Sequence, residues 1–267
     1  MYSNQDDWQL TPIGGATGEA FMGTRRDEKV FFKRNTSPLV AALSAEGITP
    51  KLMWTQRTYS GDLLTAQEWK DGYLLEPDDM HTEAVIALIR RIHTSDYLLT
   101  MLKKSNEHLC YPLDLIELYR QDLPSALQQH HFFNQVIRGL EDALDDDFYT
   151  VAYCVCHGDL HHANFLQSDD QLYLVDWENV RIADPLSDLT KILCAYFSPS
   201  QWTHWLTQYG FPFDETTYKR VQWYSQMNCL LMIKHYYSES RLPRMNEIVL
   251  LLKAIYERAQ QDKLKQQ

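Results

Sequence analysis

The chain has 267 residues, a formal net charge of −11 and a composition of 45% hydrophobic and 23% charged residues, which is ordinary for a soluble globular protein. A surface this acidic repels phosphate backbones, so polymeric DNA or RNA is excluded as a general substrate. The sequence has no apolar run long enough to span a bilayer and no secretion leader, so we expect a cytoplasmic protein without membrane insertion.

The first eighty residues carry short apolar runs between turn residues, a pattern typical of antiparallel strands. We expect one short helix at Leu39–Glu46 and strands at Trp8–Ile13, Ala20–Gly23, Lys29–Lys33, Leu52–Thr55 and Leu63–Trp69. After Asp78 the apolar residues recur at helical spacing. This spacing predicts helices at Thr82–His93, Leu113–Gln129, Phe132–Leu144 and from Leu186 onward, interrupted by strands at Thr150–Cys156 and Gln171–Val175.

The order of these elements, strands first and helices later, predicts an α+β fold in two lobes. We assign residues 1–70 to an N-terminal lobe and residues 71–267 to a C-terminal lobe, with a hinge near Asp71 and Gly72. A cleft between two such lobes is a common place for a small-molecule site.

The five cysteines are odd in number and have no secretion context, so we interpret them as free buried thiols: Cys110, Cys154, Cys156, Cys194 and Cys229. Cys154 and Cys156, beside His157, raise the alternative of a metal site. However, Cys-x-Cys lacks the two-residue gap typical of zinc ligands, and no second pair accompanies it. We therefore expect both thiols to face inward on a buried strand.

The segment His157-Gly158-Asp159-Leu160-His161-His162-Ala163-Asn164 carries the strongest chemical signal, together with Val175-Asp176-Trp177-Glu178. Asp159 and Asn164 lie five positions apart in a polar loop, and Asp176 follows the next apolar strand directly. Phosphoryl transfer needs one group that orients the attacking hydroxyl and hard oxygen ligands that hold Mg²⁺. Asp or Asn alone is common in turns, but the spacing His-x-Asp-x-x-x-x-Asn, followed by Asp after the next strand, matches the catalytic and metal-binding loops of kinases.

These motifs resemble those of the aminoglycoside/choline phosphotransferase family, whose members have a bilobal protein-kinase-like fold. The resemblance implies an ATP- and Mg²⁺-dependent phosphotransferase that acts on the hydroxyl of a small molecule. It implies that Asp159 is the catalytic base and that Asn164 and Asp176 bind Mg²⁺. The whole length of the chain fits the family's layout, a lobe of strands followed by a helical lobe.

The resemblance also assigns residues to nucleotide binding in the first lobe. Lys33 ends an apolar strand where the family places a lysine that contacts phosphates, and Glu46 would pair with it; a solvated surface lysine is the alternative. Gly15 and Gly18 fall where a loop should cover the phosphates, although a hairpin turn explains them as well. The backbone of Gln67, Glu68 and Trp69 would contact the adenine edge, since these residues lie at the family's interlobe hinge.

Further residues would complete the catalytic lobe. By the resemblance, Asp188 braces the catalytic loop by accepting its backbone N–H groups, although an acid in the first turn of a helix also suits the helix dipole. His161 is expected to pack in the loop and contact substrate. Trp177 and Glu178 directly follow the metal-binding Asp176, so we expect them to line the acceptor pocket.

The acceptor is suggested by finer similarity at Leu10–Ile13, Phe32–Pro38, Ala66–Trp69 and Tyr173–Trp177. These stretches resemble a subgroup of CcrZ-type cell-cycle regulators, which implies a ribose-type sugar or nucleoside as acceptor, with replication or cell-division proteins as partners. Choline or an aminoglycoside is the alternative acceptor. Aromatic residues of the second lobe can stack a nucleobase or enclose a quaternary ammonium, so they do not distinguish these acceptors.

Two other functional classes remain open. The first is a regulatory protein on a kinase fold that acts mainly through protein contacts. The second is a metal-dependent hydrolase built on His157, Asp159, His161 and Asp176, with zinc or manganese as its metal. The hydrolase hypothesis assigns no role to Asn164 or Lys33.

Overall fold

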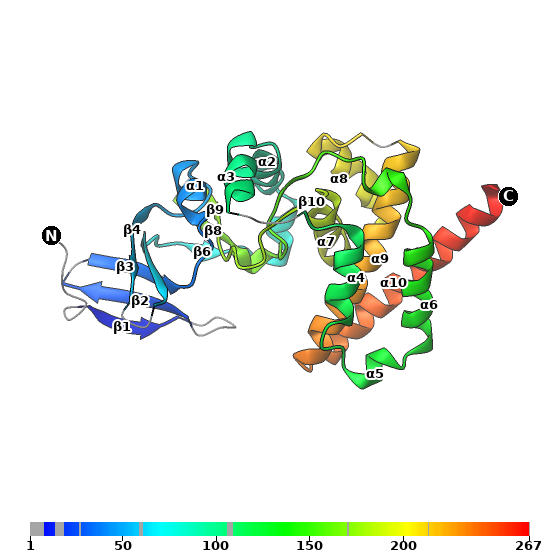
Figure 1. The fold of residues 1–267 in the computed structure, drawn as a ribbon, viewed down its shortest axis with the longest axis horizontal. Helices are drawn as coiled ribbons and strands as arrows, with labels where there is room; N and C mark the ends of the chain where they lie inside the picture. The colour runs from blue at the N-terminus through cyan, green and yellow to red at the C-terminus, as the bar shows by residue number, and fades with distance from the viewer. Residues whose placement is uncertain are drawn as a thin grey trace.

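The computed structural model describes residues 8–13, 19–26, 28–58, 61–105, 109–169, 171–212 and 214–266. Strands gather at the N-terminal end of the molecule and helices at the C-terminal end, as Figure 1 shows. The predicted α+β architecture, with an antiparallel sheet followed by a helical region, is confirmed.

Within the described residues, the N-terminal sheet consists of five antiparallel strands in the order β1-β2-β3-β5-β4. They are β1 (Gln9–Pro12), β2 (Ala20–Arg25), β3 (Glu28–Arg34), β4 (Leu52–Arg57) and β5 (Leu63–Glu68). Val30 and Phe32 of β3 pack with Ala66 of β5 in a small core on one face of the sheet. Because side chains alternate along a strand, Lys33 lies on the face opposite this core.

Two small groups of paired strands frame the candidate site. One sheet has the order β6-β8-β9, and β7 pairs with β10 in another. Their bounds are β6 (Tyr73–Leu74), β7 (Cys154–Cys156), β8 (Phe165–Ser168), β9 (Gln171–Leu174) and β10 (Arg181–Ala183). The segment 157–164, here called the Asp159 loop, connects β7 to β8, and the segment 175–180, the Asp176 loop, connects β9 to β10. In Figure 1, β8 and β9 lie between the N-terminal sheet and the helices.

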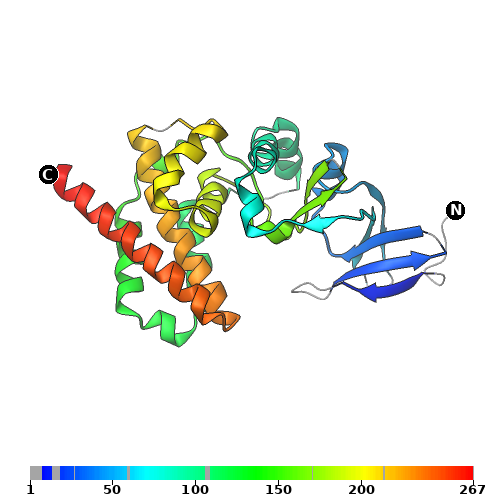
Figure 2. The same ribbon diagram turned by 180° about the vertical axis from the view of Figure 1, so that it is seen from behind.

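The helical region surrounds one large apolar core. Its helices are α2 (Glu83–His93), α3 (Asp96–Lys104), α4 (Pro112–Arg120), α5 (Ser125–Gln128), α6 (His131–Asp142), α7 (Leu186–Tyr196), α8 (Trp202–Tyr209), α9 (Glu215–Ser238) and α10 (Leu242–Gln266). α9 packs against both α7 and α10, and Figure 2 shows α10 in front of α9. In the described part of the chain, no helix combines the length and apolarity needed to cross a bilayer.

Most of the C-terminal aromatic residues belong to this core and are therefore not free to stack a ligand: Trp202, Trp205, Tyr209, Trp223 and Tyr224. The short helix α1 (Val40–Ala45) also joins it through Ala42 and Leu43, although α1 lies within the first lobe of the sequence.

The structure differs from the sequence prediction where elements are short or interrupted. The helix expected at Leu113–Gln129 is two helices, α4 and α5, because Asp122 takes a φ of 48° and Pro124 has no N–H to continue the helix. The sequence did not predict α3, β6, β8 or β10. Strands of two or three residues, such as β6 and β10, are too short to show a period.

Candidate active site

The Asp159 loop and the Asp176 loop are joined by hydrogen bonds. The amide group of Asn164 donates to the backbone oxygen of Asp159 at 2.9 Å. The Val175 N–H donates to the backbone oxygen of Asn164 at 2.9 Å, and His157 Nε2 donates to the backbone oxygen of Val175 at 2.9 Å. Since Asp176 follows Val175 directly, the structure brings Asp159, Asn164 and Asp176 onto two adjoining loops.

Asp188, in the first turn of α7, holds the start of the Asp159 loop. Its carboxylate accepts the N–H groups of His157 at 2.7 Å and of Gly158 at 2.9 Å, and His93 Nε2 lies 3.3 Å from the same group. Burial by itself would raise the pKa of Asp188, but the hydrogen bond and charge of His93 lower it below its ordinary value. The ionised carboxylate therefore fixes the direction in which the chain enters the loop.

Gly158 permits the sharp turn before Asp159. It has a φ of +81°, and a Cβ at this position would lie 2.2 Å from the backbone oxygen of Asn179. No side chain fits there without displacing the backbone of the Asp176 loop. The glycine therefore allows the two loops to approach closely.

His157 and Trp177 support the loops from inside the protein. His157 Nδ1 accepts the Asp159 N–H at 3.2 Å while Nε2 donates to Val175, and burial lowers the pKa of His157, so the imidazole is neutral. The ring of Trp177 lies 4.7 Å from that of His157, and its N–H donates to the Leu174 oxygen. Trp177 is buried, which corrects the expectation that it lines an acceptor pocket.

The Asp159 carboxylate is partly exposed and has two neighbours, the ammonium group of Lys191 and the imidazole of His161. Lys191 Nζ of α7 donates to Oδ1, and His161 Nε2 lies 3.6 Å from Oδ2. Burial would raise the pKa of Asp159, but the hydrogen bond from His161 and the charge of Lys191 together lower it well below its ordinary range. Asp159 is therefore ionised at neutral pH and presents an acceptor oxygen to the solvent side.

Lys33 reaches the Asp176 loop from the N-terminal sheet. Its Nζ lies 2.7 Å from Asp176 Oδ1 and 2.7 Å from Glu178 Oε1. Burial would lower the pKa of Lys33, but the hydrogen bonds to both carboxylates raise it, so the ammonium group is charged. Glu178 therefore contacts the lysine of the N-terminal sheet, and its place in an acceptor pocket stays a prediction.

The oxygen atoms around Asp176 suit a magnesium ion. The carboxylates of Asp176 and Glu178 converge on one cation, the Lys33 ammonium, and the Asn164 amide belongs to the adjoining loop. Carboxylate and amide oxygens are the ligands that Mg²⁺ prefers. Asp176 also has a φ of 64°, an uncommon backbone conformation for a residue with a side chain, and such residues cluster at functional sites.

The ion pair expected between Lys33 and Glu46 is absent among the described residues. Glu46 is the C-cap of α1, and its carboxylate accepts the Ser95 hydroxyl at 2.8 Å. The reason is that α1 packs into the core of the helical region, which turns its C-terminal end toward α3. Lys33 is positioned instead by the Asp176 loop.

The remaining expected nucleotide residues are only partly described. The Gln67 side chain is buried and donates to the Pro50 oxygen, and the backbone N–H of Glu68 donates to the backbone oxygen of Lys51 at 2.8 Å. The Trp69 indole N–H donates to Asp71 at 2.9 Å. The Glu68 N–H is therefore not available to adenine, and a backbone contact from Gln67, Glu68 and Trp69 stays a prediction. Gly15 and Gly18 lie outside the described residues.

Lys191 and Tyr196 were not predicted from the sequence. Lys191 lies three residues after Asp188, and this spacing on a helix puts both side chains on one face, toward the Asp159 loop. Tyr196 Oη accepts the His162 N–H at 2.9 Å and lies 2.9 Å from His162 Nδ1, and burial raises the pKa of Tyr196 to about 12. A search for charged residues at helical spacing from Asp188 would have found Lys191.

The cysteines are free, as predicted, and all are buried except Cys110, which is only partly buried; Cys154 and Cys156 lie on β7. Ligand-type atoms of His93, Cys154 and Cys156 lie within 4.8 Å of one another. Both nitrogens of His93 are already in hydrogen bonds, with Tyr209 and Asp188. The two nitrogens of His157 are likewise occupied, which removes a ligand from the alternative metal-dependent hydrolase.

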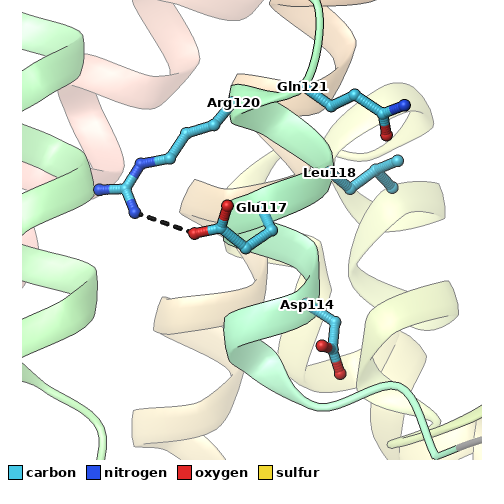
Figure 3. Close-up of a pocket in the computed structure, with 5 residues that line it drawn as sticks. All are labelled: Asp114, Glu117, Leu118, Arg120 and Gln121. Atoms are coloured by element: carbon cyan, nitrogen blue, oxygen red, sulfur yellow. Dashed lines mark hydrogen bonds and ion pairs between the residues drawn. The ribbon is translucent and has the colours of Figure 1, made fainter.

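A surface hollow on α4 lies apart from these loops. Figure 3 shows its lining residues, which run along α4 from its first turn to its C-cap: Asp114, Glu117, Leu118, Arg120 and Gln121. Arg120 and Glu117 form an ion pair at 3.2 Å on the exposed helix surface. The lining includes no predicted site residue, so the hollow gives no reason to relocate the site.

Comparisons with known proteins cover most of the chain. The model of the phosphotransferase enzyme family matches residues 32–224, a range that includes Lys33 and both loops. The choline kinase LicA from Streptococcus pneumoniae has a TM-score of 0.69 and 18% identity, with 92% of this chain and 93% of that chain covered. A choline/ethanolamine kinase family protein from Mesorhizobium loti has a TM-score of 0.60 and 18% identity, over 94% and 87% of the two chains.

A spectinomycin phosphotransferase solved with ADP and spectinomycin gives a TM-score of 0.60 at 15% identity, over 90% of this chain and 88% of that chain. At these identities the similarity shows a shared fold. The predicted kinase-like fold is therefore confirmed.

Proposed function

The chain belongs to the phosphotransferase enzyme family, and from this premise we propose that it transfers the γ-phosphoryl group of ATP to a hydroxyl of a small molecule. The observation that carries the proposal is the hydrogen-bonded arrangement of Asp159, Asn164 and the Asp176 loop, with Lys33 on Asp176. This set contains a carboxylate for the acceptor hydroxyl, oxygen ligands for a metal and a lysine for phosphates.

Each residue has a defined task in this proposal. Asp159 accepts a hydrogen bond from the acceptor hydroxyl, orients it toward phosphorus and takes its proton. Asn164 and Asp176 would hold Mg²⁺, which supplies charge neutralisation at the phosphate oxygens. Lys33 would bind phosphate oxygens of the nucleotide once it is released from the two carboxylates. Nucleotide use is supported by the solved complexes of LicA with AMP and of spectinomycin phosphotransferase with ADP.

For the acceptor, we propose a neutral ribose-type sugar or nucleoside. The proposal rests on the resemblance of Leu10–Ile13, Phe32–Pro38, Ala66–Trp69 and Tyr173–Trp177 to the CcrZ-type subgroup. Choline and an aminoglycoside remain the alternative acceptors, because solved structures with a similar fold carry the names choline kinase and spectinomycin phosphotransferase.

The acceptor proposal is tested by Mg²⁺-dependent ATP consumption with ribose, deoxyribonucleosides, choline, ethanolamine and spectinomycin. We expect turnover with a sugar or nucleoside, and mass spectrometry with NMR then gives the position of the new phosphate. Efficient phosphorylation of choline would refute the neutral acceptor. Nucleotide binding without turnover of any compound would favour the regulatory alternative.

The role of Asp159 is tested by Asp159→Asn, which removes the proton acceptor and keeps the shape of the side chain. We expect kcat to fall by about 10²–10⁴-fold, with little change in the urea midpoint because the side chain is partly exposed. Asp145→Asn is the matched control, since Asp145 also pairs with a lysine, Lys219, on the surface. Activity of Asp159→Asn at the wild-type rate would disprove the role.

A finer proposal follows from the resemblance to CcrZ-type cell-cycle regulators, namely a role in coordinating replication with division. It is tested in a host strain whose corresponding gene is deleted and replaced by wild type or by Asp159→Asn. If catalysis supplies the role, only wild type restores normal timing of replication initiation. Full rescue by Asp159→Asn would show that protein contacts carry the role instead.

A further inference from the structure

Lys191 connects α7 to the reacting centre. α7 presents Asp188 to the backbone of the Asp159 loop and Lys191 to the side chain of Asp159 itself. The Lys191 side chain is 20% exposed and the Asp159 side chain is 37% exposed, so the pair lies at the surface of the site and remains accessible to a ligand. Among the described residues, Lys191 donates its side-chain hydrogen bond to Asp159.

The chemistry of the transfer places phosphate oxygens beside this ammonium group. An acceptor hydroxyl hydrogen-bonded to Asp159 must lie about 3–3.5 Å from phosphorus in a reactive arrangement. A lysine ammonium has three N–H donors, and Asp159 Oδ1 uses one of them. The others can therefore reach oxygens of the transferred group, while Asp159 Oδ2, which has His161 Nε2 at 3.6 Å, has a further lone pair that can accept the hydroxyl.

A purely structural ion pair is the alternative. However, a lysine held on the catalytic carboxylate makes that carboxylate a weaker base, which is a cost for an enzyme unless the cation has another task. Besides the proton transfer to Asp159, phosphoryl transfer depends strongly on charge stabilisation at the transferred group. Lys191 is positioned to supply this charge stabilisation.

We propose that Lys191 is a catalytic residue that contacts the γ-phosphoryl oxygens during transfer and keeps Asp159 aligned with the acceptor. In this step the bond between the acceptor oxygen and phosphorus forms, and the bond between phosphorus and the β–γ bridging oxygen of ATP breaks. The hydroxyl proton passes to Asp159 Oδ2 and then to solvent, and the products are ADP and a phosphate monoester. The inference rests on the proposed function of Asp159 and the nucleotide.

The test compares wild type with Lys191→Met and Lys191→Arg, and with Lys219→Met as a matched control from another lysine–aspartate pair. Because the contact forms only during transfer, Lys191→Met should lower kcat and kcat/KM equally, by about 100–1,000-fold, and leave the acceptor KM nearly unchanged. Lys191→Arg should have a kcat at least about tenfold higher than Lys191→Met, since it restores a cation. Lys219→Met should remain near wild type.

Binding supplies a second readout that does not need the acceptor. Mg²⁺–ADP with fluoroaluminate imitates the transferred group, so Lys191→Met should weaken this complex about 100-fold and weaken Mg²⁺–ADP less than about threefold. Equal effects on both complexes, or a kcat within about threefold of wild type, would overturn the catalytic role. If wild type neither gains affinity from fluoroaluminate nor hydrolyses ATP nor transfers phosphate, the proposed function fails and the inference falls with it.

Discussion

Replacing Asp188 by Asn tests whether one buried carboxylate fixes the loop that carries Asp159. Asp188 is 1% exposed and is approached by three donors, at 2.7 Å from His157, 2.9 Å from Gly158 and 3.3 Å from His93. Hydrogen bonds to a charged group contribute about 1.5–3 kcal/mol each. Asn keeps one acceptor oxygen but turns an amide N–H toward a donor, and it leaves the His93 imidazole without its counter-charge.

We therefore expect Asp188→Asn to lower the free energy of unfolding by about 3–5 kcal/mol, the usual cost of breaking a buried pair by removing one partner. The assay is urea unfolding at neutral pH, followed by tryptophan fluorescence. We also expect kcat to fall by about 100-fold, because a loop displaced by about 1 Å misplaces Asp159.

The matched control for this prediction is Asp214→Asn. Asp214 also accepts a backbone N–H, from Thr217 at 2.7 Å, but it is an exposed N-cap, where Asn serves as well as Asp. Its free energy of unfolding should stay within about 0.5 kcal/mol of wild type. If Asp188→Asn loses less than about 1 kcal/mol, the reasoning from its three contacts is wrong.

Two further predictions concern the same loop. Gly158→Ala should lower the free energy of unfolding by more than about 2 kcal/mol and reduce kcat, because φ is +81° and the new Cβ would lie 2.2 Å from a backbone oxygen. Gly210 has a similar φ but open space around it, so Gly210→Ala should lower the free energy of unfolding by only about 1–2 kcal/mol. Equal losses in urea unfolding would contradict the steric argument. His157→Gln tests the neutral imidazole: the pKa of His157 is lowered below 6.5, so its stabilising contribution is full above that pH and decreases as the pH falls toward the folded value. The stability difference from wild type should therefore shrink between about pH 8 and pH 5, and a constant difference would show that His157 does not titrate this way.

Local patterns were enough to predict the chemistry of this protein and the class of its fold. The spacing of Asp159, Asn164 and Asp176 between apolar strands identified the adjoining loops, because such residues need only a strand end and a turn to become neighbours. Alternating and helical periods also located most strands and helices, since both depend on residues close in sequence.

The sequence alone did not determine the partners of charged side chains from distant elements. Lys33 lies 143 positions before Asp176, and it pairs with Asp176 because β3 faces the Asp176 loop, while α1 turns Glu46 toward Ser95. Lys191 lies 32 positions after Asp159, and only the packing of α7 against that loop brings the two together. A long lysine side chain can reach any acid within several ångströms, so its partner depends on how the helices and sheets pack, which local spacing does not specify.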